Sequence, residues 1–100
     1  MSQKTKLQNK KAATENAQVS FTTIGWEDFE HWRASDTKIH AEICRLIGEC
    51  MRTPFEGLGK PEPLKGDLSG YWSRRITKEH RFVYYFSAGM LTVIACRYHY

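Results

Sequence analysis

The chain has 100 residues, a formal net charge of +4 and an aromatic content of 13%. This length suits one domain, near the lower limit at which an ordinary hydrophobic core is sufficient for stability. The aromatic content and the balanced charge exclude a disordered chain. No apolar run approaches the roughly 18 residues of a membrane helix, and the N-terminus lacks the apolar segment of a secretory signal. We therefore expect a cytoplasmic protein that does not associate with a membrane.

The cysteines indicate free thiols. Their number, three, is odd, which argues against a disulfide framework. Cys44 and Cys50 are six positions apart, which on a shared helix separates them by about 240°. Neither these nor Cys96 has the CxxC spacing of a zinc site. We expect buried thiols in a reducing compartment, with no metal and no cofactor.

The charge is unevenly distributed along the chain. Residues 1–17 carry four lysines against one glutamate, residues 18–56 carry four basic and seven acidic side chains, and residues 57–100 carry seven basic and three acidic ones. An acidic middle and a basic C-terminal part favour two different faces, the second suited to a polyanion.

The N-terminal region predicts a tail followed by a first strand. Residues 1–17 are polar and lack the periodicity needed to bury one face, so we predict a flexible tail there. The folded domain is expected over residues 18–100. A β-branched and aromatic stretch at residues 19–24 predicts its first strand.

Two amphipathic helices are predicted next. Aromatic residues at helical spacing give the first helix a stripe that we expect in the core: Trp26, Phe29 and Trp32. Six apolar residues form the corresponding stripe of the second helix: Ile39, Ile43, Leu46, Ile47, Cys50 and Met51. Ser35 and Asp36 offer its N-cap, and Pro54 ends it because the residue before a proline leaves helical geometry. His40 lies off the stripe and is expected at the solvated surface.

Residues 53–70 contain all three prolines and four of the seven glycines, which predicts a long loop. A loop of this length in a small domain tends to be functional. Pro61 and Pro63 flank Glu62 and hold its backbone extended. A carboxylate on so rigid a backbone is well placed for a catalytic role. The same tripeptide is also a common surface turn, and these residues alone leave both interpretations open.

The C-terminal part predicts an antiparallel meander. Strand patterns at residues 71–77, 81–86 and 91–97 are separated by turns at 78–80 and 87–89. The fold class is therefore α+β with element order βααβββ. We expect a mainly antiparallel four-stranded sheet with both N-terminal helices packed on one face.

Groups suited to phosphate chemistry are expected to meet on one face of this sheet. They come from the loop, from neighbouring strands and from the end of the last strand: Glu62, Lys65, Arg75, Arg81, His99 and Tyr100. In metal-free cleavage of RNA by its own 2′-hydroxyl, a base takes the 2′-OH proton, cations stabilise the phosphorane and an acid protonates the leaving 5′-oxygen. Periodicity alone leaves this as one hypothesis beside a last strand that simply ends in amphipathic surface residues.

Five stretches carry a more specific pattern: residues 52–57 (RTPFEG), 59–65 (GKPEPLK), 68–77 (LSGYWSRRIT), 79–81 (EHR) and 95–100 (ACRYHY). They resemble the YoeB (Txe) family of toxins in toxin–antitoxin pairs, over roughly residues 19–100. The resemblance implies a RelE-like toxin domain and a ribosome-dependent mRNA endonuclease that inhibits translation. Residues 1–17 extend beyond the usual start of the family, so the tail is predicted from composition only.

Carried over by position, the resemblance makes Glu62 the general base and His99 the general acid, with Arg81 stabilising the scissile phosphate. Three further positions would contact phosphate or complete the site beside the acid: Lys65, Arg75 and Tyr100. The implied partners are a cognate antitoxin of the YefM or Phd type, the ribosome and mRNA, operator DNA through the antitoxin, and a second copy of the chain. The alternative is a non-catalytic module that binds antitoxin or RNA and acts in transcriptional autoregulation.

Overall fold

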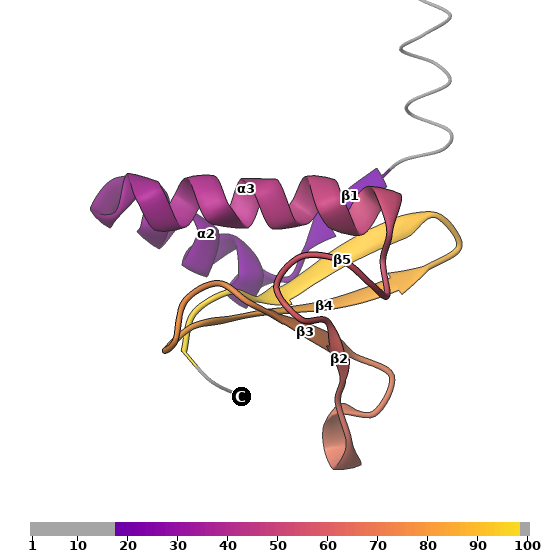
Figure 1. The fold of residues 1–100 in the computed structure, drawn as a ribbon. Coiled ribbons are helices and arrows are strands. Elements are labelled where there is room, and N and C mark those ends of the chain that lie inside the picture. The colour runs from indigo at the N-terminus through magenta and orange to yellow at the C-terminus, as the bar shows by residue number, and fades with distance from the viewer. Residues whose placement is uncertain (1–17, 99–100) are drawn as a thin grey trace, which may run out of the picture.

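The computed structural model describes residues 18–98, in which two helices cover one face of a five-stranded sheet (Figure 1). The elements follow in the order β1 (Gln18–Phe21), α2 (Thr23–Ser35), α3 (Thr37–Arg52), β2 (Glu62–Pro63), a 3-10 helix (Gly66–Leu68), β3 (Trp72–Arg75), β4 (Arg81–Ser87) and β5 (Met90–Ala95). The predicted tail over residues 1–17 and two predicted site residues, His99 and Tyr100, lie outside the described residues.

The strand order in the sheet is β1-β5-β4-β3-β2. β1 pairs parallel with β5, and the other neighbours pair antiparallel. The predicted α+β class with both helices on one face is confirmed, but the sheet has five strands instead of four. The additional strand, β2, arises where a loop was predicted, because the two prolines that hold Glu62 extended allow Glu62 to pair with Ser73.

Capping residues set the limits of both helices. Thr22 is the N-cap of α2, and its Oγ1 accepts a hydrogen bond from the Gly25 backbone N at 2.9 Å. The first strand consequently ends before the predicted residue 24. Asp36 caps α3 by accepting from the backbone N of Lys38 and of Ile39, both at 3.1 Å. α3 ends at Arg52, so Thr53, the residue before Pro54, is the first one outside the helix, as the proline rule predicts.

The core lies between α3 and the central strands. The apolar stripe of α3 contributes residues with no exposed surface, and β4 and β5 contribute alternate residues facing the helices: Ile43, Leu46, Cys50, Phe82, Tyr84, Leu91 and Val93. Full burial of one such apolar side chain stabilises the fold by about 1.5–3 kcal/mol relative to exposure. Of the described residues, none forms a helix long and apolar enough to cross a membrane.

Two predictions about the helices were wrong. Trp32 is buried, but Trp26 is 50% exposed and packs outside the core against Phe29, with ring centroids 5.9 Å apart. His40 is not a solvated surface residue. Its ring packs 4.4 Å from that of Phe29, because the two helices lie side by side, and its Nε2 is buried without a hydrogen-bond partner among the described residues.

The three cysteines are free thiols. Cys44 is exposed and Cys50 buried, as their separation around α3 predicts, so the expectation of burial fails for Cys44 alone. Burial raises the pKa of Cys50 to about 11 and that of Cys96 to about 12. The two buried thiols therefore remain protonated at neutral pH and act as small apolar groups.

Candidate active site

The sheet face away from the helices carries the candidate site. Helix α3 and helix α2 lie on one side of the strands, and within residues 18–98 no α-helix covers the other side (Figure 1). Residues directly opposite in paired strands share a face, and side chains alternate along each strand. Arg74 pairs with the core residue Phe82, so its neighbours in sequence, Ser73 and Arg75, face away from the helices. On this face, called the open face below, Ser73 is buried and Arg75 is exposed.

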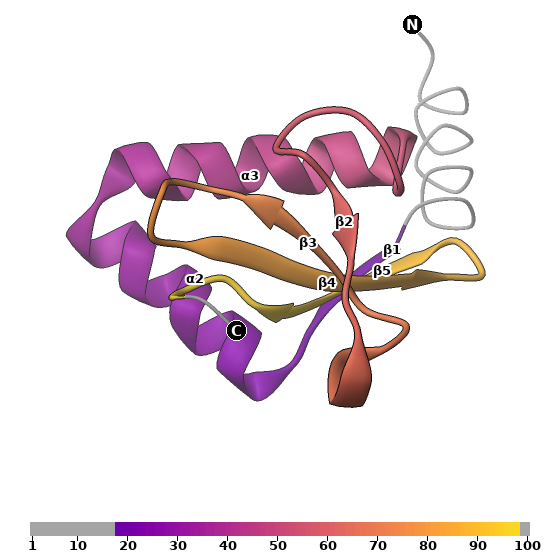
Figure 2. The same ribbon diagram turned by 60° about the horizontal axis from the view of Figure 1, so that its bottom comes forward.

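Three of the six predicted site residues are brought together on this open face. Glu62 pairs with Ser73, and Arg75 pairs with Arg81. Glu62 is therefore the diagonal neighbour of Arg75, at about 7–8 Å, a distance that long side chains bridge. Figure 2 shows the chain passing from α3 through a loop into β2, at the edge of the sheet beside β3.

Arg75 and Arg81 form a cross-strand pair of like charge. The backbone N of Arg75 donates to Gly59 O at 2.7 Å and that of Arg81 to Tyr98 O at 3.1 Å, so both amides point away from the pair. In such a non-hydrogen-bonded pair the side chains come closest together. Like charges directly opposite are destabilising, and an anion between them would remove that cost.

The guanidinium of Arg81 is held by the β3–β4 turn. Its Nη1 donates to the backbone oxygens of Thr77, Lys78 and His80 at 2.8, 3.2 and 3.1 Å. An arginine has five N–H donors in a planar fork. One nitrogen therefore fixes the orientation of the group, while the charge remains at the surface of the sheet.

Lys65 is not part of this register. It is exposed, follows the end of β2, and precedes the 3-10 helix Gly66–Leu68 as its N-cap residue. Lys65 therefore lies in the segment between β2 and the 3-10 helix and not on a strand of the sheet. His99 and Tyr100 are outside the described residues, so their placement is not part of this geometry.

The exit of β5, immediately before those two residues, is tightly held. The backbone N of Cys96 donates to Asp28 Oδ2 at 3.0 Å, and its backbone O accepts from Trp32 Nε1 at 2.9 Å. Two residues later the backbone N of Tyr98 donates to His80 Nδ1 at 2.8 Å. The guanidinium of Arg97 lies over the rings of Trp32 and Tyr98, 5.9 and 4.7 Å from their centroids. Helix α2 and the β3–β4 turn thus fix the end of the last strand.

A buried arginine that the sequence analysis did not single out supports the loop before Glu62. Arg74 has no exposed surface. Its Nη1 donates to Leu58 O at 3.0 Å, and its Nη2 donates to Thr53 O and to Glu56 O. Nε donates to the Tyr84 hydroxyl at 3.2 Å. The available signal was the strand alternation, which puts residue 74 in phase with the core-facing residues 72 and 76.

Tyr84 completes this anchor from the core. Its hydroxyl accepts from Arg74 and donates to Pro54 O at 2.6 Å. Burial is the main cause that raises the pKa of Tyr84 to about 12. The phenol therefore stays neutral and keeps the proton that it donates to the loop.

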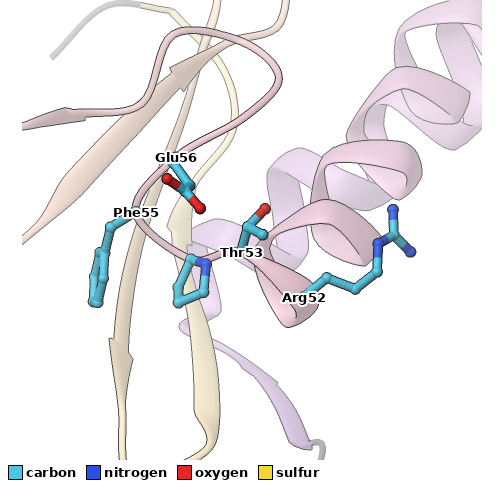
Figure 3. A pocket seen from close by; sticks show the side chains of 5 residues that line it. Arg52, Thr53, Phe55 and Glu56 are labelled. Carbon is cyan, nitrogen blue, oxygen red and sulfur yellow. The ribbon is translucent and has the colours of Figure 1, made fainter.

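The anchored loop forms a pocket at the end of α3, lined by Arg52, Thr53, Pro54, Phe55 and Glu56 (Figure 3). Phe55 packs against the ring of Trp72, with centroids 4.8 Å apart. None of the six predicted site residues lines this pocket. The candidate site is the open sheet face, and the pocket is a separate feature of the loop.

Known proteins resemble the chain over most of its length. The family model described as the YoeB-like toxin of bacterial type II toxin–antitoxin systems matches residues 21–100. Toxin YoeB of Streptomyces coelicolor is 56% identical over 82 residues, which cover 82% of this chain and 98% of that protein.

Solved structures agree with the sequence comparison. The YoeB/ParE toxin from Agrobacterium tumefaciens matches with a TM-score of 0.80 and 54% identity, covering 83% of this chain and 99% of that one. YoeB from Staphylococcus aureus has been solved as a dimer, with a TM-score of 0.80, 37% identity and coverage of 85% and 99%. It has also been solved in a heterotetrameric complex with YefM, with a TM-score of 0.79, 38% identity and coverage of 84% and 98%. These matches confirm the predicted RelE-like fold.

Proposed function

The chain belongs to the YoeB-like toxins of bacterial type II toxin–antitoxin systems, and from this premise we propose that it is an endoribonuclease that cuts mRNA on the ribosome. The observation that carries the proposal is the open sheet face, where Glu62 lies diagonal to Arg75, and Arg75 lies directly opposite Arg81. A carboxylate beside two paired cations is suited to a reaction at a phosphodiester.

In the proposed reaction the Glu62 carboxylate takes the proton of the 2′-hydroxyl, and the 2′-oxygen attacks the adjacent phosphorus. Arg81, with Arg75 and Lys65 as further contacts, stabilises the negative charge that builds on the phosphorane. The bond from phosphorus to the 5′-oxygen then breaks, and His99 donates the proton that the leaving oxygen needs. One product carries a 2′,3′-cyclic phosphate, which water can hydrolyse to a 3′-phosphate, and the other carries a 5′-hydroxyl.

These roles give a bell-shaped dependence of the cleavage rate on pH. The base must be ionised and the acid protonated, so the rate falls below the pKa of the first group and above that of the second. Tyr100 would complete the site beside His99. A flat rate from about pH 5 to 9, with chemistry limiting, would contradict a Glu62/His99 pair.

We also propose that a small antitoxin of the YefM type neutralises the chain and that the chain forms a homodimer. The support is YoeB from S. aureus, which has been solved in a complex with YefM (38% identity to this chain) and as a dimer (37% identity). Through such an antitoxin the chain would also take part in binding operator DNA.

The second candidate function is binding without catalysis. The like-charged pair Arg75–Arg81 on an open face would hold RNA or an acidic protein segment even if no bond were cleaved. Growth arrest on expression separates the two functions, because a pure binding module keeps its effect when the proposed acid is removed. We expect His99→Ala to relieve the arrest.

The decisive experiment maps cleavage of a reporter mRNA with and without ribosomes. Glu62→Ala and His99→Ala should each reduce cleavage by about 10²–10⁴-fold, the usual contribution of a general base or acid, with unchanged circular dichroism. Glu27→Ala, at an exposed carboxylate on α2, is the matched control and should cleave as the wild type does. Full activity in both site variants would overturn the proposal.

A further inference from the structure

A hydrogen bond to one imidazole helps to hold the end of the described chain. The backbone N of Tyr98 donates to Nδ1 of His80 at 2.8 Å. In both ribbon views the β3–β4 turn, which contains His80, lies beside the exit of β5 and close to α2 (Figures 1 and 2). The same residue accepts through its backbone O from Ile76 N at 3.0 Å, so the turn itself fixes its position.

This hydrogen bond defines the protonation state of His80. A backbone N–H can donate only to a ring nitrogen that carries no proton. The imidazole must therefore be neutral, with its proton on Nε2. Trp32 and Tyr98 flank the ring with centroids 4.7 and 5.7 Å away, which limits its rotation.

Tyr98 needs such support because its backbone conformation is unfavourable. Its φ is 63°, in the left-handed region, which costs a residue other than glycine roughly 1–2 kcal/mol. Both backbone groups of the residue are engaged, since Tyr98 N donates to His80 and Tyr98 O accepts from Arg81 N at 3.1 Å. The conformation persists because the neighbouring strand and turn hold it from both sides.

We propose that His80 is a positioning residue for the C-terminal catalytic group. By holding the Tyr98 backbone against Arg81, the neutral imidazole fixes the point at which His99 begins. This inference rests on the proposed function, because it gives His80 a role in cleavage only if His99 is the acid. A displacement of about 1 Å at a reacting group can lower a rate by about 10²-fold.

The test compares two replacements of His80 in the full chain. His80→Leu removes the acceptor, and His80→Asn keeps one, because Oδ1 of asparagine is separated from Cα by the same number of bonds as Nδ1 of histidine. The leucine variant should lower kcat by about 10–100-fold with little change in KM. The asparagine variant should restore kcat to within about threefold of the wild type.

Readouts independent of activity come from the same variants. In ¹⁵N NMR spectra the wild-type His80 should show a proton on Nε2 and none on Nδ1. The Tyr98 amide should exchange slowly in the wild type and in His80→Asn, and fast in His80→Leu. His31→Leu is the matched control, since His31 packs 4.7 Å from the same Trp32 ring on α2, and it should leave cleavage and Tyr98 exchange unchanged.

Three results would overturn the inference: a proton on Nδ1, wild-type kcat in a folded His80→Leu, or equal impairment of the two His80 variants. His99→Ala, measured in parallel, distinguishes failure of the positioning role of His80 from failure of the proposed function. An inactive His99→Ala beside a fully active His80→Leu rejects only the positioning role. An active His99→Ala rejects the proposed acid itself.

Discussion

Arg74 and Arg75 are neighbours on β3 and have opposite surroundings. Arg74 faces the helices, has no exposed surface and donates its hydrogen bonds to backbone oxygens of the loop and to Tyr84. Arg75 faces away from the helices, is exposed and lies opposite Arg81. An arginine side chain therefore stabilises the fold on one face of the sheet and is available to a ligand on the other. Strand alternation decides which face each of the two arginines occupies.

The largest effect on stability is expected from Arg74→Met. The change leaves three loop oxygens and a buried phenol without their donor, and each unsatisfied buried group costs about 1–3 kcal/mol. We expect the free energy of unfolding to fall by about 3 kcal/mol or more, measured by urea denaturation. A loss below about 1 kcal/mol would mean that water replaces the guanidinium without difficulty, and the contrast with Arg75 would disappear.

A somewhat smaller loss is expected from Gly59→Ala, which tests how closely the loop approaches β3. Gly59 has a φ of 79°, and a Cβ there would lie 3.1 Å from Arg74 Cβ and from Arg75 O. The backbone strain alone costs roughly 1–2 kcal/mol. Gly48→Ala is the matched control on α3, where a Cβ meets nothing within 4 Å, and it should stabilise the chain by about 0.5–1 kcal/mol. Thermal unfolding of both variants measures the difference.

Arg75→Met should affect function and leave stability almost unchanged. A substitution at an exposed position changes the free energy of unfolding by about 0.5 kcal/mol or less. Loss of one phosphate contact should reduce reporter mRNA cleavage about tenfold, equivalent to about 1.4 kcal/mol. Unchanged cleavage would remove Arg75 from the site. A loss of stability as large as that of Arg74→Met would show that Arg75 also stabilises the fold, which contradicts the contrast between the two faces.

The smallest effect concerns Glu49, beside the loop that Arg74 anchors. The hydrogen bond from Arg52, at 2.9 Å, is the main cause that lowers the pKa of Glu49 below its usual value of 4.5. A lowered folded-state pKa stabilises the fold above the unfolded-state pKa, and this contribution is lost as the pH falls through the folded-state value. Between about pH 5 and 3 the wild type should therefore lose slightly more stability than Glu49→Gln. If urea denaturation shows the same pH dependence of stability for the wild type and Glu49→Gln, the hydrogen bond from Arg52 to Glu49 does not stabilise the fold.

Local rules were sufficient for much of the fold. The limits of α3 follow from a side-chain acceptor at Asp36 and from Pro54, both visible in the sequence. The burial of β5 follows from its apolar run. β2 was missed because two residues, one of them proline, carry no periodic signal, and their pairing with β3 depends on a distant partner.

For the candidate site the sequence predicted which residue types gather, but not what holds them. Alternation and a hairpin turn suffice to expect Arg75 and Arg81 near each other. The support from Arg74 and His80 could not be predicted, because both side chains bind backbone groups far away in the sequence. Arg74 binds backbone oxygens 16 to 21 positions away, and His80 accepts from a backbone N 18 positions away. Burial of Trp26 was predicted wrongly, because helical spacing does not tell how far along a helix its contact with the sheet extends.

The position of β5 in the sheet affects the order in which the domain folds. This strand is the last in the sequence, yet it lies between β1 and β4 and contributes Leu91 and Val93 to the core. Its partner β1 is separated from it by about seventy residues, so closing that contact requires ordering nearly the whole chain. During synthesis the helices and the β3–β4 hairpin can begin to form early, but the sheet is completed only after the final strand has emerged. Folding therefore ends late and close to the C-terminus, and a nascent chain stopped before residue 90 lacks the strand that joins its two halves.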